Sequence, residues 1–109
     1  MVEIGEMLYV VLTTVKNLAE AKKISEKLVS ERLAACVSSV PGAKSVYHWK
    51  GKIERADEVL LIAKTSKQKL DQLICRIKRL HSYDVPEILA LKVERGCSEY
   101  LRWVEESLR

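Results

Sequence analysis

The side chains best suited to chemistry gather in one short segment, HSYDVPE, which begins at His81. Its imidazole, phenol and carboxylate groups can move protons or ligate a metal, and they belong to His81, Tyr83, Asp84 and Glu87. Pro86 fixes its own backbone φ and favours an extended conformation at the residue before it. The apolar run 88–93 that follows is typical of a buried strand. The segment therefore fits either a site at the mouth of a strand or an ordinary helix-to-strand connection.

Metal ligands are few in this sequence. There are two histidines, His48 and His81, and three cysteines without CxxC spacing. A tight transition-metal site needs several imidazole or thiolate ligands that converge, and His81 is the histidine of the HSYDVPE segment that could act as one. The alternative for His81 is a structural histidine that hydrogen-bonds to Tyr83 or Glu87. The odd number of cysteines argues against both a disulfide framework and a zinc knuckle.

Catalytic chemistry has little support. Asp84 and Glu87 could form a general acid–base group with His81. The sequence contains no nucleophile motif, glycine-rich phosphate loop or paired cysteines to accompany them. We therefore expect a protein that is not an enzyme, with no catalytic residues.

Length and composition predict a single domain, residues 1–109, with a net charge of +4. No run approaches the ~20 apolar residues of a membrane span, and the N-terminus lacks the layout of a secretory signal. We therefore expect a cytoplasmic protein with no membrane partner. The basic segment 64–79 carries no interleaved aromatic residues and no base-reading motif. A solvated helix face explains it better than nucleic-acid binding.

The elements that position the HSYDVPE segment alternate along the chain. The stretch from Met7 to Thr14 is apolar on both alternating faces, as in a central strand. Asn17 and Glu20 have the spacing of a capping box at the start of a helix that continues to about Glu31.

Two further strands are predicted to form a long hairpin. The strand 33–40 is interrupted at Pro41-Gly42, where a kink or bulge is expected because extended sequence resumes at once. The run 45–54 has the aromatic and β-branched residues of a strand. Residues 55–57 form the predicted polar turn, and 58–64 the returning strand.

A second helix is predicted from a Ser66 cap to about Leu80, with one apolar stripe. The fourth strand then spans 85–93, and Ser98 caps a last helix that continues to the C-terminus. That helix is apolar over a wide arc formed by Tyr100, Leu101, Trp103, Val104 and Leu108.

The predicted order is β-α-β-β-α-β plus a terminal helix, an α+β fold of the ferredoxin-like type. Its helices cover one face of a four-stranded antiparallel sheet. The strands are apolar on both faces, so the uncovered face of a monomer would be a large apolar patch, which monomers in water avoid. We therefore predict a homo-oligomer.

Several motifs resemble the CutA divalent-cation tolerance family over essentially the whole chain. The similar segments are LAACV, YHWKGKIE, EVLLIAKT, HSYDVPEI and YLRW. The resemblance implies a ferredoxin-like subunit in a PII-like homotrimer, with the hairpin and the C-terminal segment at the subunit contacts. Trp49, Leu61 and Trp103 are the residues expected at the subunit interface.

The resemblance also implies a link to copper and other divalent cations, and a role in the response to metal ions. His81 matches the family's signature histidine. Some bacterial relatives have a cysteine in place of Thr13 and a second histidine in place of Leu80, so the full ligand set is missing. We expect Cu(II) or another divalent cation to bind only weakly.

Two other functions remain open. A PII-like signalling module would bind a small anionic ligand in a cleft between subunits, lined by Lys64, His81, Tyr83 and Glu87. A trimeric scaffold would instead hold another protein.

Overall fold

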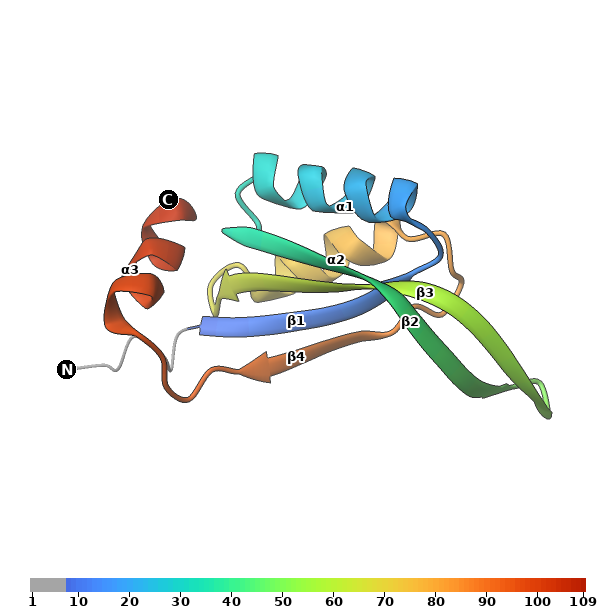
Figure 1. Ribbon diagram of the computed structural model, residues 1–109. Helices are drawn as coiled ribbons and strands as arrows, with labels where there is room; N and C mark the ends of the chain where they lie inside the picture. Colours follow the sequence, from blue (N-terminus) through green and yellow to red (C-terminus); the bar gives the residue numbers. More distant parts are fainter. Residues whose placement is uncertain (1–7) are drawn as a thin grey trace.

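The computed structural model describes residues 8–109. Their elements follow the predicted order, with a four-stranded antiparallel sheet in the order β2-β3-β1-β4 (Figure 1). The elements are β1 (Leu8–Val15), α1 (Leu18–Ser30), β2 (Cys36–Trp49), β3 (Lys52–Ser66), α2 (Leu70–Leu80), β4 (Ile88–Lys92) and α3 (Ser98–Ser107). The ferredoxin-like α+β fold is confirmed. Met7, predicted to open the first strand, lies outside the described residues.

Helices α1 and α2 cover one face of the sheet and enclose the main core (Figure 1). Fully buried side chains from both helices and the two central strands form it, including Val11, Val15, Ile24, Leu28, Leu61, Leu73 and Ile77. The predicted cap of α1 is confirmed, because Asn17 Oδ1 accepts a hydrogen bond of 2.8 Å from the Glu20 N–H.

Helix α2 starts later than predicted. Ser66 is the last residue of β3, where it pairs with Leu8, so its backbone cannot open a helix. A turn follows, in which Ser66 Oγ accepts a hydrogen bond of 3.3 Å from the Lys69 N–H. The helix then begins at Leu70.

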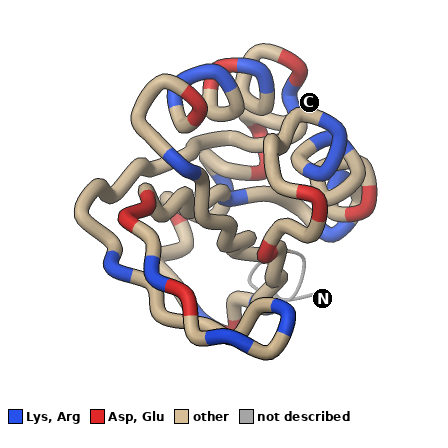
Figure 2. Tube along the Cα trace, turned by 90° about the vertical axis from the view of Figure 1, so that its right-hand side faces the viewer, with Lys and Arg blue, Asp and Glu red and all other residues tan. Residues whose placement is uncertain are grey.

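The basic character of segment 64–79 is partly neutralised by α1. The Arg76 guanidinium forms a two-pronged ion pair with the Glu31 carboxylate, at 2.8 and 2.9 Å. Lys78 and Arg79 are exposed. Basic and acidic residues both occur around the helices (Figure 2), as expected for a solvated surface.

The turn of the β2–β3 hairpin lies at Lys50-Gly51, so the prediction of a turn at 55–57 was wrong. Both turn residues have positive φ, 50° and 79°, as a two-residue hairpin turn requires. Residues 55–57 instead continue β3, opposite residues 44–46 of β2. The predicted irregularity at Pro41-Gly42 is confirmed as a register shift between Val40 and Ala43.

The end of the chain packs beside the sheet rather than on either broad layer. Strand β4 is shorter than predicted and begins at Ile88, after Pro86, which has no N–H to donate. Helix α3 forms a second small core with Leu8 through Leu101, Val104 and Leu108. The other apolar side chains of its wide arc, Tyr100 and Trp103, are nearly half exposed.

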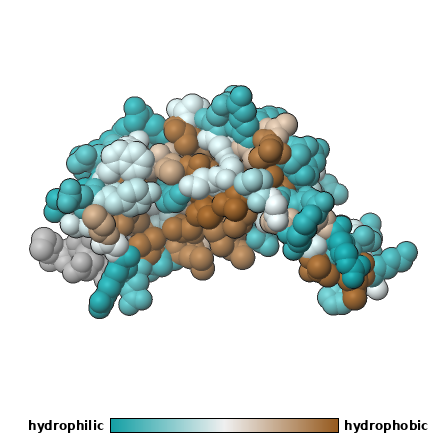
Figure 3. Space-filling model, viewed as in Figure 1, coloured by the Kyte–Doolittle hydropathy of each residue, from teal (hydrophilic) through white to brown (hydrophobic). Residues whose placement is uncertain are grey.

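The face of the sheet opposite the helices is apolar and uncovered within this chain. Val40 is 46% exposed, and Leu89 and Leu91 are each 53% exposed. These side chains share the face with Val10, Leu12, Leu60 and Ile62, as the pairing register and the strand alternation require. Apolar atoms gather along this lower side of the molecule (Figure 3).

Leu61 does not lie on that face, so its expected place at the subunit interface was wrong. Side chains alternate along β3, and Leu61 points with Val59 and Ala63 towards the helices. It is 1% exposed in the core of the subunit itself. Leu60 and Ile62 occupy the opposite, uncovered face.

The β2–β3 hairpin projects beyond the helices and gives the molecule an elongated shape of 50 × 25 × 23 Å (Figure 1). The projection begins where β1 ends, because beyond the pair Val15–Val59 strand β3 pairs with β2 alone. Within residues 8–109, no helix has both the length and the apolar character that crossing a membrane requires.

Candidate functional site: a cleft beneath the hairpin

Both ring nitrogens of His81 form hydrogen bonds within the subunit. Nε2 lies 2.8 Å from the carbonyl oxygen of Thr14, which can only accept, so Nε2 carries the proton. Nδ1 accepts a hydrogen bond of 3.1 Å from the Tyr83 N–H. The imidazole is 8% exposed and has no free lone pair for a metal in this arrangement. The geometry matches the structural alternative, with the hydrogen bond made to the backbone of Tyr83.

Tyr83 connects this junction to the hairpin. Its hydroxyl donates a hydrogen bond of 2.7 Å to Glu58 Oε2, and its ring lies 4.8 Å from that of His81. Burial, followed by the hydrogen bond and the charge of Glu58, raises the pKa of Tyr83 well above its usual value. Tyr83 is therefore a hydrogen-bond donor at neutral pH.

Glu20 fixes the other side of the junction. Its carboxylate accepts hydrogen bonds from the N–H groups of Lys16 and Ser82, at 3.1 and 2.8 Å. Burial raises the pKa of Glu20, but the hydrogen bonds from Ser82 and Lys16 outweigh it, so the pKa lies below its usual value. The N-terminus of α1 is thus tied to the segment that follows α2.

A cleft of about 650 Å³ lies between the hairpin and the segment 82–87. The hairpin contributes Ser45, Val46, Tyr47, Trp49 and Glu58, the segment contributes Ser82, Tyr83, Asp84, Val85 and Glu87, and Thr14 lies at the end of β1. Within the described part of the chain, the charged lining residues are Glu58, Asp84 and Glu87, and no lysine or arginine is among them.

The predicted cleft residues are only partly brought together. Tyr83 and Glu87 line the cleft, whereas His81 supports it from behind. Lys64 lies outside this cleft, and its place in a cleft between subunits stays a prediction. It is six residues from Glu58 along β3, about 20 Å at the rise of a strand, and its Nζ donates to Ser38 Oγ at 2.7 Å.

Glu58, Tyr47 and Trp49 are lining residues that the sequence analysis did not place in the cleft. The wrong prediction of a turn at 55–57 is the reason. With that turn, the hairpin would not reach this part of the fold. The pair Lys50-Gly51 was the signal that could have located the turn, since glycine readily adopts positive φ.

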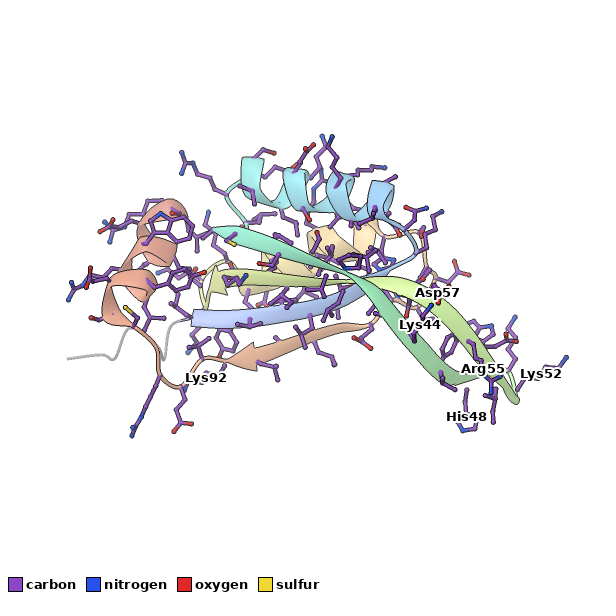
Figure 4. All side chains as sticks on the ribbon, viewed as in Figure 1. Lys44, His48, Lys52, Arg55, Asp57 and Lys92 are labelled. Atoms are coloured by element: carbon purple, nitrogen blue, oxygen red, sulfur yellow. The ribbon has the colours of Figure 1, made fainter. Side chains whose placement is uncertain are left out.

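The described residues do not form a copper centre within one chain. In the range 8–109, no group of three or more His, Cys, Asp or Glu side chains is arranged to hold a metal ion. His48 lies on the far part of the hairpin with Lys52 and Arg55, and Lys92 lies at the other end of the molecule (Figure 4). The two histidines therefore belong to separate surroundings.

Comparisons with known proteins agree with this fold. Residues 9–107 match the family described as CutA1 divalent ion tolerance protein. The chain belongs to the CutA family. A divalent-cation tolerance protein CutA of Thermus thermophilus is 47% identical over 98 residues, covering 90% of this chain and 95% of that protein. The chain spans about half the length, 56%, of a chloroplastic CutA protein of rice with which it shares 46% identity over 92% of its own length.

Solved CutA structures resemble the chain throughout. The CutA structure from Xylella fastidiosa has a TM-score of 0.92 at 42% identity and covers 94% of this chain and 98% of that one. The structure from Thermus thermophilus has a TM-score of 0.90 at 46% identity, covering 93% and 98%. The predicted family and fold are thus confirmed.

The names of other CutA relatives bear on location and on enzymatic activity. They include chloroplastic proteins and one periplasmic protein, from Archaeoglobus fulgidus. The cytoplasmic location therefore stays a prediction. The family description names ion tolerance and no reaction, and the absence of catalysis also stays a prediction.

Proposed function

We propose that this CutA chain acts in divalent-cation tolerance, and in the response to metal ions, as a homotrimer in which the uncovered sheet faces are buried against one another. The name of the family supports the cation link. The number three comes from the family resemblance.

The observation that carries the proposal is the uncovered apolar face of the sheet. Leu89 and Leu91 on β4 and Val40 on β2 are about half exposed. On the helix side, Ile88 of β4 and Val37 of β2 are partly buried against the main core. Burial of apolar surface is worth about 25 cal/mol per Å², so a partner covering this face would add substantial stability. A second copy of the chain offers a surface of the same character.

The hairpin and α3 extend this contact surface. Val46 and Ile53 on the hairpin are 63% and 60% exposed, and Trp49 and Trp103 are also exposed. Aromatic and aliphatic side chains on a projecting arm are typical of a contact between subunits. Trp49 and Trp103 remain proposed interface residues, and Leu60 and Ile62 replace Leu61.

A tight copper site is not part of the proposal. His81 has both nitrogens occupied, and the described chain contains no convergent ligand group. We therefore propose weak binding of Cu(II) or another divalent cation. The cleft within one chain fits a small anionic ligand poorly, because its charged lining among residues 8–109 is acidic. The alternative of a PII-like module places such a ligand in a cleft between subunits and stays a prediction.

Sedimentation velocity at micromolar concentration tests the assembly. The expected mass is about three times the 12.4 kDa of one chain. Leu91→Asp places a charge on the uncovered face and should shift the protein towards monomer. Leu18→Asp, at a position 60% exposed on α1, is the matched control and should leave the mass unchanged. A folded wild-type monomer under these conditions would contradict the proposal.

A further inference from the structure

Glu58 is a nearly buried carboxylate that forms no ion pair with the described residues 8–109. It is 8% exposed, and its hydrogen bond in the described structure comes from the Tyr83 hydroxyl. The ion pairs found among residues 8–109 join Lys44 to Asp57 and Arg76 to Glu31, and neither includes Glu58. Burying a carboxylate is costly unless a positive charge or several hydrogen bonds compensate it. The cleft that Glu58 lines is where such a charge could bind.

Aromatic rings surround the same space. Tyr47 and Trp49 line the cleft from the hairpin, and Tyr83 lines it from the segment after α2. The faces of such rings attract cations, most strongly the face of tryptophan. The Nζ of Lys50 lies 5.9 Å from the centre of the Trp49 ring, so a bound cation has to displace this exposed side chain or take a different position on the ring. The rings therefore add a second attraction for a positive charge.

The remaining charges in the cleft have the same sign. Asp84 and Glu87 add two carboxylates to Glu58, and none of the lining residues from the range 8–109 is basic. These carboxylates are not arranged as a metal centre within the described chain. A metal ion needs several oxygen ligands in direct contact, whereas an ammonium group needs one carboxylate and a ring face.

We propose that this cleft binds a small organic cation that carries a primary or quaternary ammonium group. The ammonium group pairs with Glu58, which Tyr83 holds in place, and its methyl or methylene groups contact Tyr47 and Trp49. A volume of about 650 Å³ lies within the range of small-molecule sites. Every residue that the inference uses belongs to one chain, but it rests on the proposed trimer leaving the Trp49 side of the cleft open.

Choline and its uncharged isostere 3,3-dimethylbutan-1-ol provide the test, since they share a shape and differ in charge. Both are titrated calorimetrically into the full-length protein, and tryptophan fluorescence is followed in Trp103→Phe, which leaves Trp49 as the reporter. We expect saturable binding of choline at millimolar concentration or below and at least tenfold weaker binding of the isostere. Sedimentation of the same samples separates a failed trimer from a failed cleft.

Two variants assign the binding to the cleft. Glu58→Gln should weaken choline binding at least tenfold, because it removes the paired charge. Trp49→Leu should weaken it about fivefold. Trp49 is 44% exposed in one chain but is also a proposed interface residue, so sedimentation must show that this variant still assembles as the wild type does. Glu54→Gln, an exposed carboxylate on the same strand, is the control and should change the affinity less than about twofold.

Three results would each overturn the inference. They are no saturable choline binding by the wild type, equal binding of the uncharged isostere, and unchanged affinity in Trp49→Leu. The last result applies even where Glu58→Gln does not fold. Magnesium or copper binding that depends on Glu58 without any choline binding would assign the cleft to metal ions instead.

Discussion

The two hydrogen bonds of His81 favour a structural role over that of a metal ligand. The imidazole joins the end of β1, at Thr14, to the segment that lines the cleft, at Tyr83. A metal would have to replace one of these bonds. The neighbouring pair Tyr83–Glu58 likewise joins segments 25 residues apart in the sequence.

His81→Ala is predicted to destabilise the fold by about 1–3 kcal/mol, because two buried backbone groups lose their partner. Its copper affinity, measured by calorimetry with thiols blocked, should equal that of the wild type. His48→Ala, on the exposed hairpin, is the control and should change neither property. A tenfold loss of copper affinity, about 1.4 kcal/mol, in His81→Ala alone would restore the role of metal ligand.

Tyr83 is predicted to ionise later than an ordinary tyrosine. Its pKa is raised in the folded state, so its contribution to stability is fully present below the unfolded pKa of about 10 and is lost as the pH rises through the folded pKa. An ultraviolet titration of the wild type should therefore show one tyrosine that ionises at unusually high pH. This step should be missing in Tyr83→Phe. Tyr9→Phe is the control and should keep the late step of Tyr83. A wild-type titration without a late step would contradict this prediction.

Among the elements, the hairpin depends most on one turn. Lys50 and Gly51 reverse the chain with positive φ, and the strands beyond them present the cleft residues Tyr47, Trp49 and Glu58. Helices α1 and α2 do not depend on one such residue, because each packs against the core through several apolar side chains along its length.

Gly51→Ala should destabilise the hairpin by about 1 kcal/mol, because an L side chain at positive φ is strained even where space is free. The same substitution is expected to weaken choline binding by loosening the hairpin wall of the cleft. Thermal unfolding and the choline titration measure the two effects. Lys52→Ala, next to the turn, is the control; if it costs as much as Gly51→Ala, the turn conformation is not the cause.

For the whole molecule, folding and assembly should be one process. If the uncovered face is buried between subunits, the melting temperature rises with protein concentration, and calorimetry over a hundredfold range of concentration measures this. Leu61→Asp should unfold the subunit, because Leu61 lies in its core. Leu91→Asp should remain folded and lose the concentration dependence. A melting temperature independent of concentration in the wild type would contradict the prediction.

The sequence by itself determined the order of the elements, the fold class and the family. The family came from the resemblance of motifs such as HSYDVPEI. The order of the elements and the fold class follow from local patterns: the capping pair Asn17 and Glu20, the stripe along α2, and strands apolar on both faces. Such patterns depend on residues within one or two turns of each other, so they can be read without the rest of the chain.

The tertiary structure decided which face each strand residue occupies and which distant side chains meet. Leu61 and Ile62 are equally apolar in sequence, and only the sheet register and the helices above it place Leu61 in the core. Glu58 becomes a buried carboxylate because Tyr83 reaches β3 beyond the end of β1. These contacts depend on where the chain reverses and how far β1 extends, and those are properties of the whole sheet.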